Sequence, residues 1–368
     1  MLPRDPMADP YLFYGARVSF FSAKVRCALL AKALPFREIE PTPEVYRDVI
    51  AARTGLAFIP VVVTPADETL QDSSVILDEL ERRHPQPPLY PETPVARVVS
   101  YLFELYADEF AVLPAMHYRW SFPESEAQAR RDFAAVTGDA ERASRFADRM
   151  QGSIRALGVV PESVAAIEAH TRGLLAALSA HFSVQPYLLG GRPSLADCAL
   201  MGPLFAHLYC DAVPGRLLRE SAPEVCAWIL RMNASPPDGG AFLPDDALAP
   251  TLRPLLELLG RDAAPLHLDD LRAAESWALA NPAAWDPPPR ALGMHETGLR
   301  GARFPRYTSA YAPWMIQRPA DAYRALGAPE RRAVDRALAG TGLEALLRAV
   351  PRVRVAKRGF QLVYQRAQ

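Results

Sequence analysis

A short segment of the chain, residues 58–80, combines groups that could bind a small ligand. An apolar run carries Pro60 near its start, and after a turn at 65–67 and a short polar strand, Asp72 and Ser73 open an amphipathic helix. Proline is confined to the edges and first positions of strands because it cannot donate a ladder hydrogen bond. A proline here, followed by an acid and a serine at a helix start, can present backbone groups, a hydroxyl and a carboxylate to one ligand.

Ser19 offers a further hydroxyl at the start of another helix. It ends the loop before a helix predicted over 22–33, and a helix N-terminus carries free N–H groups and about half a positive charge. A serine hydroxyl held there can donate a hydrogen bond to a bound thiolate. Two alternatives stay open: Ser19 or Ser22 only caps the helix, since serine is a preferred cap, or Tyr14 in the preceding strand carries the chemistry.

A purely structural role is also the alternative for the segment around Pro60. A trans proline that begins an edge strand is the commonest arrangement, and Asp72 and Ser73 are good helix starters in any protein. Their joint spacing with Pro60 favours the ligand-binding interpretation over this one.

The elements that must position these residues follow from the apolar pattern of the first 84 residues. Strands are predicted at 11–14, 36–39, 58–63 and 69–70, and helices at 22–33, 42–50 and 73–83. This order implies a mixed sheet with helices packed on its faces. Residues 85–94 hold five prolines and form a stiff linker that marks a domain boundary.

Beyond the linker the periodicity is helical. Helices are predicted at 95–116, 125–151, 162–182 and 224–232, and Ser194 with Asp197 forms a capping box at the start of another. Loops are predicted at 235–247 and 281–290 and around His295–Glu296, short helical runs at 250–260, 268–280, 319–327 and 329–349, and one or two strands within 353–364.

The residues singled out above resemble the glutathione transferase family, most closely its serine- and cysteine-type classes such as tau, theta and omega. The stretch 18–26 is similar to their Ser-Pro-Phe or Cys-Pro-Phe start, although Phe20 stands where those classes have proline. Ile59–Pro60 is similar to the family's cis-proline step, and Asp72–Ser73 to its acid-serine pair.

The resemblance implies an α/β thioredoxin-like N-terminal domain followed by an all-α helical domain with a C-terminal extension. The expected divisions are a flexible tail over 1–10, a glutathione-binding domain over 11–84, the proline-rich linker over 85–94, an all-α domain over 95–260, and an extension over 261–368 packed on the helical domain.

The resemblance also implies roles for individual residues. The glutathione site would consist of Phe58, Ile59, Pro60, Asp72 and Ser73, with Ser19 as the catalytic hydroxyl that stabilises the thiolate. The backbone of Ile59 would pair with the cysteinyl part of glutathione. Ser73 at a helix start suits the γ-glutamyl carboxylate, and the Asp72 carboxylate suits the γ-glutamyl ammonium.

Phe58 departs from the family at the glycyl end of this site. Related sequences often have lysine or arginine before the Ile-Pro step, where it meets the glycyl carboxylate, and Arg53 is the nearest substitute in this chain. We therefore expect glutathione to bind weakly, or a different thiol or acid to occupy the site.

The second substrate would lie against the long first helix of the helical domain. Tyr106, His117 and Trp120 supply aromatic surface there, with membership of the core as the alternative. Glu104, Asp108 and Glu109 are interpreted as a solvated face rather than as an acid–base pair.

The leading hypothesis is a glutathione transferase-like enzyme that transfers the glutathione thiolate, as co-substrate, to a small electrophilic apolar molecule. The alternative is a non-catalytic ligand-binding or protein-interaction module of the same fold, which Phe20, Phe58 and the extension favour. A cysteine-based thiol reductase is disfavoured, because the loop position is Ser19 and Cys27 falls within the helix.

The composition of the chain limits which kinds of binding partner we expect. The 368 residues carry a net charge of −1, which gives no reason to expect nucleic acid or an anionic membrane as partner. The four cysteines are far apart and no Cys/His metal spacing occurs, so we expect no metal. No run of 18 apolar residues or signal-like core is present, which favours the cytoplasm, and the resemblance implies a homodimer.

Overall fold

The computed structural model describes residues 9–234 and 240–367, so most of the predicted tail over 1–10 and residues 235–239 of a predicted loop lie outside the described residues. Its N-terminal part is built on a four-stranded sheet in the order β2-β1-β3-β4. The strands are β1 (Tyr11–Tyr14), β2 (Phe36–Ile39), β3 (Val61–Val63) and β4 (Thr69–Gln71). β1 is parallel to β2, and the other pairs are antiparallel, which confirms the predicted mixed sheet.

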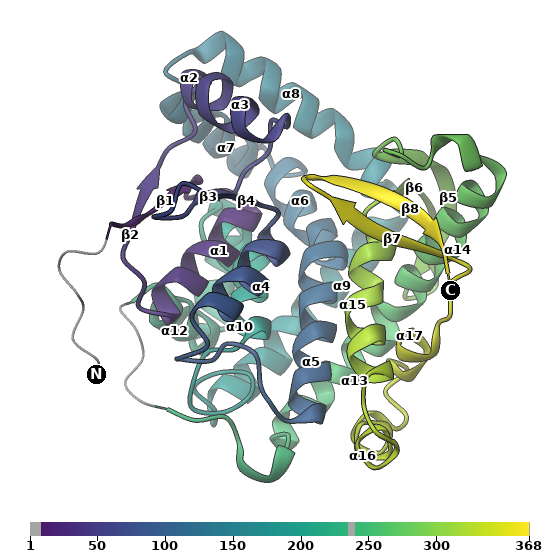
Figure 1. Ribbon diagram of the computed structural model, residues 1–368. Coiled ribbons are helices and arrows are strands. Elements are labelled where there is room, and N and C mark those ends of the chain that lie inside the picture. The colour runs from purple at the N-terminus through teal and green to yellow at the C-terminus, as the bar shows by residue number, and fades with distance from the viewer. Residues whose placement is uncertain (1–8, 235–239, 368) are drawn as a thin grey trace.

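Helices cover both faces of this sheet (Figure 1). One face meets α1 (Phe20–Ala31) and α4 (Ser73–Arg83), and the other meets the short run α2 (Pro43–Val45), η1 (Tyr46–Ala51) and α3 (Ala52–Thr54). Successive side chains of a strand point to opposite faces. Val62 accordingly packs toward α1 and α4, whereas Val61 and Val63 pack with Ile50. The predicted thioredoxin-like α/β domain is confirmed.

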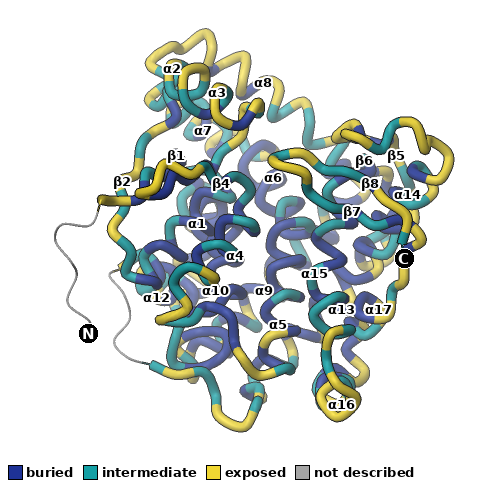
Figure 2. The backbone as a smooth tube through the Cα atoms, viewed as in Figure 1, coloured by how far each residue is buried: buried dark blue, intermediate teal, exposed yellow. Residues whose placement is uncertain are grey.

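The second domain is largely helical, as predicted. Its helices are α5 (Pro94–Leu105), η2 (Tyr106–Phe110), α6 (Val112–Trp120), α7 (Pro123–Thr137), α8 (Ala140–Leu157), α9 (Pro161–Phe182), α10 (Leu195–Met201), η3 (Gly202–Tyr209), α11 (Ala212–Ser221) and α12 (Pro223–Met232). Most residues of α5 and α10 are buried, whereas most residues of α8 are exposed or partly exposed at the surface (Figure 2).

Two of the predicted long helices are interrupted. The helix predicted over 95–116 contains the π-helical turn η2, and the helix predicted over 125–151 is two helices, α7 and α8. Gly138 adopts a φ of 63°, a left-handed conformation that ends α7, and the Asp139 side chain then accepts a hydrogen bond from the Arg142 N–H to cap α8.

The rest of the chain forms an extension of helices and two hairpins. It comprises η4 (Pro244–Asp246), η5 (Pro250–Leu252), α13 (Arg253–Asp262), α14 (Ala264–Ala280), η6 (Pro282–Ala284), β5 (Ala291–Leu299), β6 (Ala302–Ser309), α15 (Ala312–Arg324), α16 (Ala328–Leu338), α17 (Glu344–Arg348), β7 (Val353–Arg358) and β8 (Gln361–Arg366). The β5–β6 hairpin was not predicted, and the expectation of a loop at His295–Glu296 is wrong because both residues lie in β5.

The extension contacts both preceding domains. α15 runs along α5, and the β7–β8 hairpin reaches toward β4 and the start of α4 (Figure 1). The Arg318 guanidinium of α15 binds Asp78 of α4 and Glu104 of α5 at 2.7–2.9 Å. Within the described residues, no helix is both long and apolar enough to cross a bilayer.

Candidate functional site

The pairing of strands brings the predicted site residues to one edge of the sheet. Tyr14 at the end of β1 lies opposite Val61 at the start of β3, and Val61 lies opposite Gln71 at the end of β4. The loop that leads to Ser19, the Ile59–Pro60 step and the Asp72–Ser73 pair all adjoin these positions. Sequence spacing predicted each of them, and the sheet register places them together.

Ser19 has a free hydroxyl at the start of α1. Its backbone has the extended geometry of an N-cap, but its side chain makes no capping hydrogen bond, and the residue is partly exposed. The buried Ser22 hydroxyl accepts a hydrogen bond from the Ala16 N–H at 3.3 Å instead. Tyr14 is buried in the sheet core. The hydroxyl at the helix N-terminus that remains available to a ligand is therefore that of Ser19.

Arg119 fixes the loop before Ser19. One guanidinium nitrogen donates to the Val18 carbonyl at 3.2 Å, while two others bind the Asp211 carboxylate at 2.9 Å each. Arg119 and Asp211 are both buried. Because the pair belongs to the helical domain, that domain holds the loop of the first domain in place.

Phe20, where the resembling classes have proline, packs against the helical domain. Its ring is buried and packs against Gly202 of η3, where an added Cβ would lie only 2.8 Å from the ring. Phe20 therefore belongs to the contact between the two domains.

The Ile59–Pro60 peptide bond is cis, as the sequence analysis favoured. Pro60 is buried and Ile59 partly exposed. Neither the N–H nor the C=O of Ile59 has a hydrogen-bond partner among the described residues. Both groups are thus available to an extended ligand.

Asp72 and Ser73 differ in how much of each side chain is free. Asp72 has a φ of 80°, and its Oδ1 accepts hydrogen bonds from the N–H groups of Ser74 and Val75, so it caps α4. Its Oδ2 accepts hydrogen bonds from the Tyr311 hydroxyl and the Lys357 ammonium, each at 2.6 Å. The Ser73 hydroxyl has no partner among the described residues. The predicted ammonium-binding acid is therefore already paired with the extension.

Arg53 does not supply a cation near Phe58 in place of the family's lysine or arginine. It binds Asp67 at 2.6 Å and Thr69 at 3.1 Å on the surface. Phe58 is 37 % exposed, and the guanidinium carbon of Arg290, from the loop before β5, lies 4.0 Å from the centre of its ring. The cation next to Phe58 comes from the extension.

A buried cluster of charges lies behind the site. The Lys24 ammonium of α1 binds Glu104 at 2.7 Å, Asp108 at 2.6 Å and the Ser74 hydroxyl at 2.9 Å. Lys24, Glu104 and Asp108 are almost fully buried. The expectation of a solvated face is wrong for Glu104 and Asp108, because Lys24 and Arg318 supply the counter-charges that make burial tolerable.

The two carboxylates of this cluster titrate differently. Burial raises the pKa of Glu104, but Arg318 and Lys24 outweigh it and lower that pKa to about 2. Burial raises the pKa of Asp108 to about 6 and outweighs the attraction of Lys24, and the negative charge of Glu104 adds to the rise. Glu104 is therefore ionised throughout the ordinary pH range, whereas Asp108 gains a proton in mild acid.

Glu109 is a third carboxyl group in this region, and it has no ion-pair partner among the described residues. It is half-buried, and burial, followed by the charges of Asp270 and Asp108, raises its pKa to about 8. The group is thus mainly neutral at pH 7.

We expect Glu109→Gln to change how stability depends on pH. The pKa of Glu109 is about 4.5 in the unfolded chain and about 8 in the folded protein. At pH values between these two, the folded state keeps a proton on Glu109 that the unfolded state has lost. The free energy of unfolding therefore falls as the pH rises through this range. Glu109→Gln removes this titration, so the decrease in the free energy of unfolding between pH 5 and pH 8 should become smaller by roughly 1–3 kcal/mol. Urea unfolding at both pH values measures it, with the exposed Glu220→Gln as control. An unchanged pH dependence would contradict the prediction.

The predicted electrophile-binding residues are buried in the core. The Tyr106 hydroxyl bonds to His170 Nε2 at 2.8 Å, and the His117 ring bonds to Ser121 and Glu168. Trp120 is 3 % exposed and packs in a separate apolar cluster. The structure therefore gives them the core roles that the sequence analysis held as the alternative. Among the described residues, no three His, Cys, Asp or Glu side chains gather as a metal site.

Comparison with known families supports the two-domain division. Residues 13–88 match the family model described as glutathione S-transferase, N-terminal domain, and residues 160–236 match the one described as glutathione S-transferase, C-terminal domain. No curated protein sequence matches the chain significantly.

Several solved structures are similar to part of this chain. A glutathione S-transferase of Methylobacterium radiotolerans in complex with glutathione sulfonate is 23% identical, with a TM-score of 0.40, over 64% of this chain and 98% of that one. The β-etherase LigF of Sphingobium sp. is 21% identical, with a TM-score of 0.44, over 62% and 96%. FzlA from C. crescentus is 19% identical, with a TM-score of 0.40, over 67% and 92%.

The class within the family, predicted as one of the serine- and cysteine-type classes, stays a prediction. The two domain matches, in this order and on the sheet and helices described above, show that this chain carries an N-terminal and a C-terminal domain of the glutathione transferase type.

Proposed function

We propose that the chain is a glutathione transferase-like enzyme that binds a glutathione-type thiol at the sheet edge and transfers it to a small apolar electrophile. The observation that carries this proposal is the set of unpaired groups at that edge. The Ser19 hydroxyl, the backbone groups of Ile59 and the Ser73 hydroxyl have no side-chain or backbone partner there among the described residues. Their chemistry suits three groups of glutathione, in the same order: the Ser19 hydroxyl suits the sulfur, the Ile59 backbone suits the cysteinyl backbone, and the Ser73 hydroxyl suits the γ-glutamyl carboxylate.

Ser19 would act on the sulfur of the bound thiol. A hydroxyl that donates to a thiolate makes a charge-assisted hydrogen bond, which favours the ionised form at neutral pH. The thiol proton leaves to solvent, the thiolate forms a bond to the electrophilic carbon, and the leaving group departs with its bonding electron pair. Holding both reactants at one edge lowers the barrier further by proximity.

The remaining expectations belong to this proposal. A cytoplasmic location, expected in the sequence analysis, remains part of this proposal. Homodimerisation across the two domains requires a face that α15 leaves open, because α15 already covers part of α5 and binds Asp78 of α4.

The second candidate is a non-catalytic binding module of the same fold. It is favoured by the pairing of Asp72 with Tyr311 and Lys357, which removes one contact that glutathione would otherwise make. The two candidates differ in turnover but not in thiol binding.

Two measurements test the proposal. Calorimetry at millimolar glutathione should detect binding, and 1-chloro-2,4-dinitrobenzene with glutathione should be turned over above the uncatalysed rate. Binding without turnover of this or other generic electrophiles would favour the module. Absence of binding by glutathione and by related peptide thiols would end the proposal.

A further inference from the structure

The acid that should hold the amine of the ligand already holds an amine from the chain itself. The Lys357 ammonium lies 2.6 Å from Asp72 Oδ2, and the Tyr311 hydroxyl donates to the same oxygen at 2.6 Å. The other oxygen, Oδ1, caps α4 through the N–H groups of Ser74 and Val75. Both carboxylate oxygens are therefore engaged.

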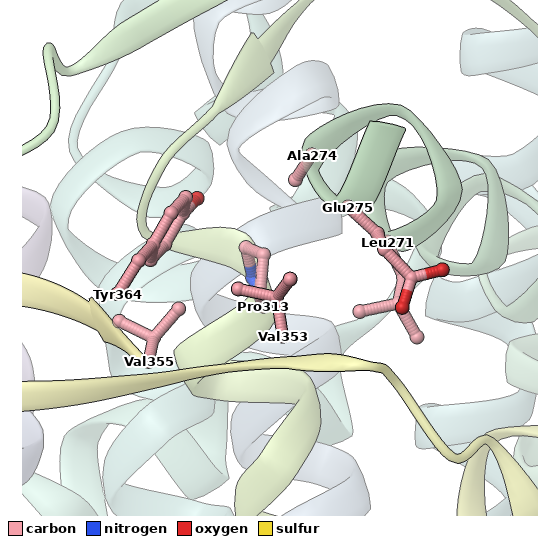
Figure 3. Close-up of a pocket in the computed structure, with 7 residues that line it drawn as sticks. All are labelled: Leu271, Ala274, Glu275, Pro313, Val353, Val355 and Tyr364. Atoms are coloured by element: carbon pink, nitrogen blue, oxygen red, sulfur yellow. The ribbon is translucent and has the colours of Figure 1, made fainter. Parts of the chain in front are cut away.

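Lys357 is held in this place by a well-packed hairpin. The Gln317 amide accepts from the Val355 N–H at 2.8 Å and donates to its carbonyl at 2.9 Å, so α15 fixes the middle of β7. Val353, Val355 and Tyr364 pack toward α14 around a small pocket (Figure 3). These contacts make the hairpin a fixed part of the site rather than a loose arm.

The surroundings of the ammonium also favour its present position. The Lys357 nitrogen lies 3.9 Å from the centre of the Trp314 ring and 5.2 Å from that of Tyr311, and its side chain is only 16 % exposed. Cations bind aromatic faces favourably, more so when they are shielded from water. A ligand ammonium that took the place of Lys357 on Asp72 would leave a shielded cation without its counter-charge, which is costly.

The charges that remain available at the site are suited to anions. The free Ser73 hydroxyl stands at the N-terminus of α4, which favours negative charge. Arg290 is exposed beside Phe58, and its guanidinium has no acidic partner among the described residues. One carboxylate can bind at each place without disturbing the Asp72–Lys357 pair.

We propose that Lys357 is a specificity-determining residue that occupies the place of the ligand's amine, so that this chain selects dicarboxylate peptide thiols without a charged α-amino group. The inference rests on the proposed function and adds which thiol the site prefers. Lys357 excludes the charged amine by occupying its counter-ion, while Ser73 and Arg290 retain the two carboxylates.

The test compares glutathione with deaminated glutathione, in which hydrogen replaces the α-amino group. We expect calorimetry on the full chain to show binding of the deaminated thiol at least about tenfold tighter, since a displaced buried ion pair costs more than this factor. Lys357→Met frees Asp72 and should reverse the preference, whereas Lys357→Arg keeps a cation and should retain it. The neighbouring Arg358→Met is the control, because Arg358 pairs with Asp286 at the surface.

The outcomes separate this inference from the proposed function. Equal affinity of the wild type for the two thiols, or a preference for glutathione, overturns the role of Lys357 while leaving the enzyme proposal intact. Failure of both thiols to bind the wild type and Lys357→Met overturns both. If Lys357→Met does not fold, the wild-type ratio and Lys357→Gln, a polar side chain without charge, decide the question.

Discussion

Replacing Lys24 with methionine should lower the free energy of unfolding by about 3–5 kcal/mol, the usual cost of leaving a buried charge without its partner. Lys24 is fully buried and binds both Glu104 and Asp108, so the variant leaves two carboxylates facing each other in the interior. Arg318 still binds Glu104 at 2.8 Å, but no other cation within residues 9–234 and 240–367 pairs with Asp108. Urea unfolding monitored by circular dichroism measures the loss.

Two further variants sharpen this test. The triple variant Lys24→Met, Glu104→Gln, Asp108→Asn removes the uncompensated charges and should regain much of the loss. Arg47→Met breaks the exposed pair with Asp48 and should cost less than about 1 kcal/mol. If Lys24→Met proved as mild as Arg47→Met, the cluster would not contribute to stability as described.

The second large effect concerns Ser19. We expect Ser19→Ala to lower kcat/KM for thiol transfer about 10–100-fold, because a hydrogen bond to a charged group contributes about 1.5–3 kcal/mol and each 1.4 kcal/mol is tenfold. The pKa of the bound thiol should rise accordingly, by about 1–2 pH units. Thiolate absorbance of the bound thiol, titrated against pH, separates this from a loss of binding.

The hydroxyl rather than the size of Ser19 should matter. Ser19→Thr keeps the donor and should retain most of the activity, and Ser183→Ala at an exposed helix end should leave it unchanged. Stability should change little in Ser19→Ala, because the hydroxyl makes no capping bond. Full activity in Ser19→Ala would remove Ser19 from the mechanism.

Local patterns predicted the first domain well. Alternating and helical apolar periods gave its strands and helices, and turn and cap residues gave most of their ends, because these signals depend on neighbours in the chain. The β5–β6 hairpin was missed because Gly293 and Gly298 weaken the strand pattern. Its only strong signal is the tight turn at Arg300 and Gly301, both with positive φ.

The charged residues of the second domain show where such reasoning fails. Glu104 and Asp108 read as a solvated face, since one sequence cannot reveal that Lys24 and Arg318 lie opposite them. Tyr106 and Trp120 could equally have lined a pocket or the core, and only packing places them in the core. Burial depends on what covers a helix, and that comes from distant segments.

The sequence by itself determined the two-domain fold and singled out the candidate groups at the sheet edge: Ser19, the Ile59–Pro60 step and Asp72–Ser73. The tertiary structure alone decided which of those groups are free. The chain has only three lysines, at 24, 32 and 357, and folding pairs each with a carboxylate. Lys357 meets Asp72 because the extension folds back over the sheet edge, and no spacing rule relates residues so far apart in the chain. Ion pairing is a matter of distance in space, so it becomes visible only once the chain has folded.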